Sequence, residues 1–215
     1  ALHHDAKLDI YEKSLRLSGH GPALLVRELY AREAWIGTWA NEFAGARKDA
    51  SIRFEGDDSL RVVLFRCDDV AKAKEVKKLI RALYGRGNYS CHINDTHEET
   101  VRLAQLLFNA QGVHFLNHAS PRYFQRFHRH LELYRDWLGK TGADPELFCI
   151  EGSASLAAYG LRDAQDLDIL HLRDADFGPV SPGVNSHNAD VHHHTVTRDQ
   201  ILFDPEHHFH YAGLK

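Results

Sequence analysis

The sequence predicts an α/β protein whose C-terminal part has α+β character. Strand-length apolar runs alternate with helix-period segments between residues 60 and 117. An apolar stripe with helical spacing covers residues 120–139, and two further strand-length runs, 147–150 and 166–170, lie on either side of a Gly-Ser turn. Such periodicities separate strands from helices, and their alternation is typical of layered folds. We therefore expect a small strand–helix layer followed by a mixed sheet.

Residues 1–50 are predicted to be mostly helical. Pro22 suits the first turn of a helix, because that position needs no backbone N–H donor. Apolar residues then recur at near-helical spacing, at Leu25, Leu29, Ile36, Trp39 and Phe43. Gly45 and the polar residues 47–49 are predicted to end this segment.

A β-α-β-α-β arrangement is predicted next. Its three strands are expected at residues 60–67, 89–93 and 113–116, where apolar residues are concentrated. Strands that alternate with helices at these lengths imply a parallel sheet with right-handed crossovers. Together with the helical start, this arrangement gives a first module over residues 1–118.

The two helices of this module have start and stop signals. Asp68-Asp69 can accept N-terminal N–H groups of the first helix, and Gly85 with Gly87 can end it. The second helix is predicted to begin at Thr96, because Glu99 follows three residues later in the capping-box pattern.

Polar side chains follow the predicted strand at 89–93. His92, Asn94 and Asp95 lie beside a helix start, and ligands bind at such strand ends in open α/β sheets. Two interpretations follow: these side chains hold a polar ligand or, as we favour, Asn94 and Asp95 only cap and turn the chain.

A second module is predicted over residues 119–215. Ser120-Pro121 begins a long helix, and Gly139 and Gly142 end it. Its apolar residues step by three and four, at Phe124, Phe127, Leu131, Tyr134 and Leu138. Such a stripe predicts one buried face.

Two carboxylates follow that helix with strand spacing. Side chains two apart share one face of a strand, so Asp166 and Asp168 are expected to point the same way, with Leu167 in the core. Like charges this close repel, but a divalent cation converts the arrangement into a binding site. Gly152-Ser153, ahead of a short helix, offers backbone N–H groups and a hydroxyl suited to phosphate. The alternative is a surface strand whose aspartates face water.

This stretch resembles the core of the nucleotidyltransferase superfamily, which includes DNA polymerase beta, poly(A) polymerases and antibiotic nucleotidyltransferases. The resemblance rests on Ile150-Glu151, Gly152-Ser153, twelve intervening residues and Asp166-Leu167-Asp168-Ile169. It implies a nucleotidyltransferase-like mixed sheet, with Gly152 and Ser153 on the phosphates and Asp166 and Asp168 on Mg²⁺ or Mn²⁺.

The resemblance also implies a third carboxylate on a neighbouring strand. Asp190 has the best setting, because Ala189 and Val191 are apolar neighbours and residues 192–196 can form a strand, and Asp204 is the alternative. Arg162 is a candidate for steadying phosphate charge, or else a surface residue before Asp166.

The activity implied is that of a metal-dependent nucleotidyl- or phosphoryl-transferase. Its substrate would be a nucleoside triphosphate or a nucleotide sugar, and its acceptor a small molecule, sugar or glycan.

A weaker resemblance, over residues 75–215, is to uncharacterised modules of glycan-synthesis proteins in bacteria and large viruses. It rests on residues 92–96, 114–117, 159–162 and 204–205, and it implies a polysaccharide biosynthesis context. A non-catalytic nucleotide- or glycan-binding module is therefore one alternative.

Histidines provide a second alternative. The chain has 17 of them, and seven fall between His187 and His210. His192 and His194 would share a strand face and, with neighbouring histidines, could ligate zinc or iron. A histidine-ligated metalloenzyme therefore stands beside the transferase hypothesis.

Composition limits partners and location. A net charge of −4 does not favour sequence-independent binding of long nucleic acid, because such binding needs a basic surface. The sequence contains no run of 18 or more apolar residues, so no membrane span is predicted. The first residues do not resemble a signal peptide. Three widely spaced cysteines are typical of a reducing compartment. We therefore expect a cytoplasmic protein.

Overall fold

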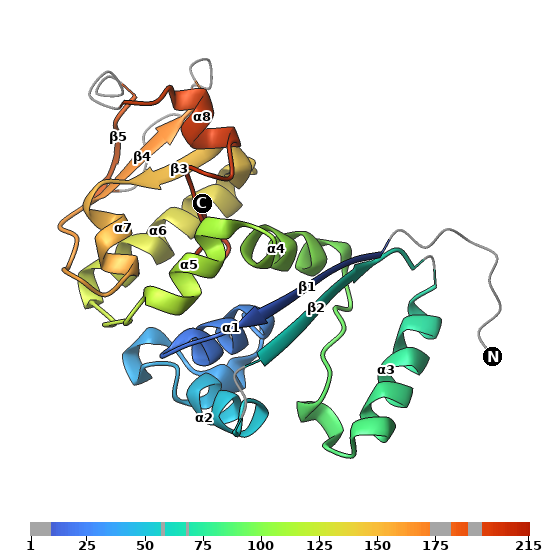
Figure 1. The fold of residues 1–215 in the computed structure, drawn as a ribbon. Coiled ribbons are helices and arrows are strands. Elements are labelled where there is room, and N and C mark those ends of the chain that lie inside the picture. The colour runs from blue at the N-terminus through green and yellow to red at the C-terminus, as the bar shows by residue number, and fades with distance from the viewer. Residues whose placement is uncertain (1–9, 57–58, 68, 173–181, 189–194) are drawn as a thin grey trace.

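The computed structural model describes residues 10–56, 59–67, 69–172, 182–188 and 195–215. Over these residues the chain is a mixed α/β fold with a two-stranded and a three-stranded sheet (Figure 1). The predicted α/β class is confirmed at this level.

The first sheet is a hairpin of β1 (Ile10–Arg16) and β2 (Ser59–Phe65). The strands are antiparallel, with Ile10 opposite Phe65 and Arg16 opposite Ser59. The strand predicted at 60–67 is confirmed, whereas β1 lies in the segment predicted to be mostly helical. Every residue of β1 is exposed or half-buried, so its apolar pattern is too weak to mark a strand.

Two helices and two 3₁₀ turns connect these strands, namely α1 (Gly21–Leu29), η1 (Ala34–Ile36), η2 (Trp39–Asn41) and α2 (Ala44–Arg53). Pro22 lies in the first turn of α1, as predicted. Gly45 was expected to end the helical segment, but it lies inside α2. A Cβ there would collide with the Trp35 carbonyl oxygen. The glycine therefore permits a close approach of two backbones instead of a helix end.

The helices α3 (Val70–Tyr84) and α4 (His97–Leu107) begin where their capping residues predict. The Asp69 side chain accepts a hydrogen bond from the first turn of α3, and the Thr96 hydroxyl accepts one from the first turn of α4. Gly85 ends α3 in the left-handed region, with φ of 66°.

The two remaining strands predicted for this module are wrong. Residues 89–93 run from the end of η3 (Gly87–Tyr89) into an irregular segment, and residues 113–116 lie inside α5 (Ala110–His118). The Asn109 side chain fixes the start of α5 by accepting two backbone N–H groups. A short apolar run fits a strand and a buried helix equally well, and here the cap decides. In the described part of the chain β2 pairs with β1 alone, so the parallel β-α-β-α-β arrangement is not formed.

The predicted amphipathic helix is confirmed as α6 (Gln125–Thr141), although it begins at Gln125 rather than at Ser120. Four of its stripe residues are buried, namely Phe127, Leu131, Tyr134 and Leu138. Gly142 ends the helix with φ of 66°, while Gly139 lies within it. A 3₁₀ turn, η4 (Pro145–Leu147), leads from this helix to the second sheet.

The second sheet contains β3 (Phe148–Glu151), β4 (Leu167–His171) and β5 (Val184–Ser186). The central strand β4 is antiparallel to β3 and parallel to β5, which makes the sheet mixed. The short helix α7 (Ser153–Ala158) connects β3 to β4, and this confirms the predicted strand–helix–strand unit.

Helices cover both faces of this sheet. Leu167 and Ile169 of β4 belong to the same apolar cluster as the buried face of α6. Leu170 instead packs with Ile201 and Leu202 of α8 (Arg198–Phe203). Side chains of β4 thus pack alternately against α6 and α8, which is typical of a strand that is buried on both faces.

The main apolar cluster crosses the whole chain, because it includes Leu25 of α1, Phe115 of α5 and Leu214 as well as β4. Residues on both sides of the predicted module boundary at 118/119 therefore share one core. No helix among the described residues is both long and apolar enough to cross a bilayer.

The last residues run beside β3. The Ile150 N–H donates to the Lys215 carbonyl at 2.8 Å. The Lys215 ammonium is buried and donates to the carbonyls of Glu146 and Leu202. This segment is therefore held at both its backbone and its side chain.

Candidate functional site

The turn after β3 places the backbone of Gly152 next to the Asp168 carboxylate. Gly152 adopts φ of 63° and ψ of −133°, a conformation that glycine tolerates best. A Cβ at this position would lie 3.2 Å from Asp168 Oδ2. The absence of a side chain at Gly152 therefore leaves space beside the Asp168 carboxylate.

A polar row crosses all three strands at this point. In the sheet register Glu151 lies opposite Asp168, and Asp168 lies opposite Asn185. Both neighbours of Asp168 within β4, Leu167 and Ile169, are fully buried on the other face. The row thus brings three polar side chains together next to the buried residues of β4.

Asp166 immediately precedes β4 and is half-buried. The Asn185 side-chain amide donates to its Oδ2 at 3.1 Å. Asp166 and Asp168 are thus both adjacent to Asn185, one through its side chain and the other through the register.

His187 lies between two carboxylates. Its Nδ1 is 2.9 Å from Glu151 Oε1, and its Nε2 is 3.1 Å from Asp168 Oδ1. The Glu151 and Asp168 side chains are only 11% and 13% exposed, so water screens these charges weakly. Despite that short distance, the buried Asp168 Oδ1 accepts no hydrogen bond among the described residues. This oxygen therefore keeps electron pairs for a further donor or a cation.

The predicted phosphate-binding residues lie on each side of α7. Ser153 is the first residue of that helix and is half-buried next to Gly152. Arg162 is exposed in the turn between α7 and β4. Its guanidinium therefore has room to move, but no contact to Asp166 or Asp168 fixes it within the described residues.

The predicted third carboxylate, Asp190, lies outside the described residues. Nearby residues 195–196 form a bend instead of the expected strand. The alternative, Asp204, follows α8, and its carboxylate accepts the Glu206 N–H within a local turn.

The histidines described near the C-terminal end have separate partners. His208 Nδ1 donates to the Ile201 carbonyl, and His210 Nε2 lies 3.2 Å from Glu146 Oε1. His192 and His194 lie outside the described residues. In the part of the chain that the structure describes, no three His, Cys, Asp or Glu side chains are grouped to hold a metal ion.

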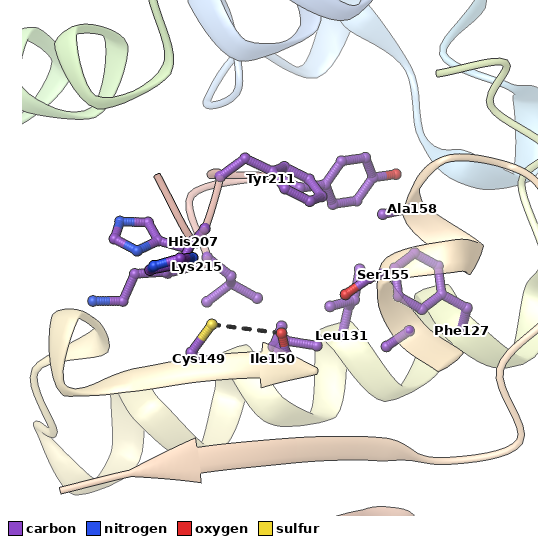
Figure 2. Close-up of a pocket in the computed structure, with 13 residues that line it drawn as sticks. Phe127, Leu131, Cys149, Ile150, Ser155, Ala158, His207, Tyr211 and Lys215 are labelled. Atoms are coloured by element: carbon purple, nitrogen blue, oxygen red, sulfur yellow. Dashed lines mark hydrogen bonds between the residues drawn. The ribbon is translucent and has the colours of Figure 1, made fainter. Parts of the chain in front are cut away.

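An apolar cavity of about 80 Å³ is lined in part by residues of α7 (Figure 2). Phe127, Leu131, Ser155 and Tyr211 line it, together with Cys149, whose thiol contacts the Ile150 carbonyl. Burial raises the pKa of the Cys149 thiol to about 12, so the sulfur carries its proton at neutral pH. The lining includes none of Gly152, Asp166 and Asp168, so the cavity is separate from the polar row.

The polar residues after 89–93 do not follow a strand. His92 contacts the Tyr30 hydroxyl and Asn94, whereas Asn94 donates to the Thr100 hydroxyl. The Asp95 backbone N–H donates to the Glu99 side chain at the start of α4. These contacts are those of a turn and a helix start, in line with the capping interpretation.

Sequence reasoning did not assign roles to Glu151, Asn185 or His187. Glu151 had a usable signal, because it is the last residue of β3 and directly precedes Gly152. Asn185 and His187 had none, because β5 has only three residues and its pairing is set by tertiary packing. Comparison of the chain with protein-family models, curated proteins and solved structures finds no match.

Proposed function

We propose that this chain is a cytoplasmic, metal-dependent nucleotidyl- or phosphoryl-transferase with a small-molecule, sugar or glycan acceptor. The observation that supports the proposal most directly is the approach of the Gly152 turn to Asp168, with 3.2 Å between the Cβ position and Oδ2. A bare backbone turn beside an aspartate suits a triphosphate that is bridged to the protein by a cation.

The side chains at this site fit Mg²⁺ or Mn²⁺. Mg²⁺ takes oxygen ligands, commonly one or two carboxylates, with water and substrate phosphates completing the shell. Asp166 and Asp168 would hold it, the latter once His187, whose Nε2 lies 3.1 Å from Asp168 Oδ1, has moved away. Asp190 is proposed as the third carboxylate. When bound, such an ion supplies a Lewis acid for the phosphoryl group and its leaving pyrophosphate.

The residues of the chain have distinct roles in this proposal. Gly152 and Ser153 hold the triphosphate through backbone N–H groups and the hydroxyl, and Arg162 moves from solvent to contact phosphate oxygens. His187 must leave Asp168 before that carboxylate can act as a ligand. In the resting arrangement the His187 ring lies between the Glu151 and Asp168 carboxylates.

The test begins with a thermal-shift screen of nucleotides and nucleotide sugars, with and without Mg²⁺ or Mn²⁺, because a ligand of the folded state raises its stability. Transfer is then assayed with the nucleotide that binds. Asp166→Asn and Asp168→Asn should each abolish transfer, since Asn keeps the volume but loses the charge. Ser153→Ala should mainly raise KM, because backbone donors remain.

Asp163→Asn is the matched control, since Asp163 is an exposed carboxylate in the same connection. It should keep full activity. Full activity in both Asp166→Asn and Asp168→Asn would end the transferase proposal. Normal activity in Asp190→Asn alone would move the third carboxylate to Asp204.

A second candidate is a non-catalytic nucleotide- or glycan-binding module. The observation that favours it is His187, which already partners Glu151 and Asp168. In that case ligands identified in the screen would bind equally well without divalent cations, and His187→Ala would lower stability without changing metal response. Binding that requires Mg²⁺ or Mn²⁺ supports the transferase instead.

A further inference from the structure

The end of α5 carries two histidines one helical turn apart. His114 and His118 are both exposed, and residues four apart lie on the same helix face. Their rings stack with centroids 4.0 Å apart and an interplanar angle of 18°. The two imidazoles therefore project side by side into solvent.

Hydrogen bonds at Nδ1 define which ring nitrogen is available. His118 Nδ1 lies 2.8 Å from the His114 carbonyl oxygen. A carbonyl only accepts, so Nδ1 of neutral His118 carries the proton and its Nε2 carries the lone pair. His114 Nδ1 lies 2.9 Å from the Tyr159 hydroxyl, and donation to that oxygen leaves the His114 Nε2 lone pair available too. Within the described part of the chain, no hydrogen bond or ion pair engages either Nε2 atom.

The groups that orient these rings are themselves fixed. The Tyr159 ring packs edge-to-face on Phe115 and Phe209, with centroids 5.2 Å and 5.4 Å away. Phe115 is 1% exposed and belongs to the same helix as the two histidines. Metal-ligating histidines usually donate their second N–H to a carbonyl or another oxygen, which sets tautomer and orientation. His114 and His118 have such a hydrogen bond at Nδ1 before any ion is bound, and the stacked rings must tilt apart for both Nε2 lone pairs to meet at one ion.

The position on the helix also favours a cation. His118 is the last residue of α5, where the unpaired carbonyls give the helix a partial negative charge. A positive ion near both rings would be stabilised by this end of the helix.

We propose that His114 Nε2 and His118 Nε2 form a bidentate site for a divalent transition-metal ion, such as Zn²⁺, Cu²⁺ or Ni²⁺. Imidazole suits these ions, whereas Mg²⁺ and Ca²⁺ prefer oxygen. Water or a further ligand completes the coordination shell. This site differs in ligand chemistry from the carboxylates of β4 and does not depend on the proposed transferase activity.

The test is calorimetric titration with Zn²⁺ and with Cu²⁺. The sequence has three consecutive histidines at 192–194, so the parent protein for all measurements carries His192→Ala, His193→Ala and His194→Ala. The parent should bind one ion, and His114→Ala or His118→Ala should each weaken binding at least ten-fold. His97→Ala, which removes an exposed histidine from α4, should bind like the parent.

Tyr159→Phe tests the positioning role of the hydroxyl. It keeps the ring packing but removes the acceptor of His114 Nδ1–H, so affinity should fall by about ten-fold. Cu²⁺ electron paramagnetic resonance supplies a second readout. It should show two coordinated imidazole nitrogens in the parent and one in His118→Gln, a variant that keeps a polar side chain at the helix end.

Two results would overturn the proposal. One is equal affinity in the parent, His114→Ala and His118→Ala, which would place the ion elsewhere. The other is a folded parent that binds neither ion.

Discussion

Two regions of the molecule use apolar residues differently. The three-stranded unit comprises β3, β4 and β5 with α6, α7 and α8, whereas the hairpin arm comprises β1, β2 and α3 and extends away from that unit (Figure 1). Helix α6 buries six of its residues, while α3 buries none. Leu131 of α6 is 4% exposed, and Leu79 of α3 is 71% exposed. Periodicity thus predicts a helix in both regions, but burial requires a partner surface.

The hairpin arm is attached by polar contacts more than by packing. Lys77 and Arg81 of α3 donate to the carbonyls of Ile93 and Cys91. The Lys13 ammonium of β1 donates to the Leu107 carbonyl. A two-stranded hairpin is marginally stable alone, and Leu15 and Leu60 supply its connection to the main core. We therefore expect substitutions in the three-stranded unit to cost far more stability.

The largest difference in the free energy of unfolding is expected between substitutions of two leucines. Leu167→Ala removes a fully buried side chain from β4 and should lower the free energy of unfolding by about 3 kcal/mol. Leu79→Ala on α3 should change it by less than about 0.5 kcal/mol. Urea unfolding followed by circular dichroism measures both. Equal losses would show that a surface covers α3 in solution.

An intermediate effect on stability, one that depends on pH, is expected at His128 of α6. Its Nδ1 donates to the Phe124 carbonyl, and its Nε2 lies 3.1 Å from the Tyr211 hydroxyl. Burial is the main cause that lowers the pKa of His128, to about 4. The unfolded chain therefore takes up the proton first as the pH falls. The contribution of neutral His128 to stability is complete above pH 6.5 and is lost toward pH 4.

The measurement is urea unfolding at a series of pH values in that window. The slope due to His128 is at most about 1.4 kcal/mol per pH unit, and His128→Gln should remove it while lowering stability at neutral pH. His97→Gln, at an exposed position of α4, should keep the slope of the unsubstituted protein. An unchanged slope in His128→Gln would assign the acid sensitivity to other groups, among them His92 and His208, whose pKa values burial also lowers.

The smallest effect is expected in the hairpin arm. Arg61 of β2 pairs with Glu12 of β1, and both side chains are largely exposed. Such pairs contribute little, because water and salt screen them. Glu12→Gln should leave the urea midpoint unchanged, and a double-mutant cycle with Arg61→Gln should show no coupling. Measurable coupling would show that the hairpin is more ordered than its exposure indicates.

Local signals predicted much of the fold. Caps at Asp69 and Thr96 and a left-handed Gly85 act within a few residues of the chain, so the ends they mark were correct. The strand predicted at 113–116 is wrong because apolar content alone does not separate a strand from a buried helix. The cap at Asn109 is the local signal for a helix there. The strand β1 was missed because its partner lies more than forty residues away along the chain.

The candidate site was predictable only within its own strand. The spacing of Asp166 and Asp168 predicts a shared face, although Asp166 lies just before β4, and Gly152 marks the turn. The pairing of Glu151 with Asp168 depends on the register between strands, and the place of His187 depends on β5. Neither register nor strand order is encoded in a local pattern, because both are set by packing against α6 and α8.

The backbone contact between Ile150 and Lys215 has a consequence for association between molecules. A strand at the border of a sheet presents unpaired N–H and C=O groups, which can recruit a strand from another chain. Here the Ile150 N–H on β3 is already bonded to the Lys215 carbonyl, and the buried ammonium of that lysine holds the segment in place. The C-terminal segment therefore occupies the border at Ile150 and hinders the pairing of another chain's strand there.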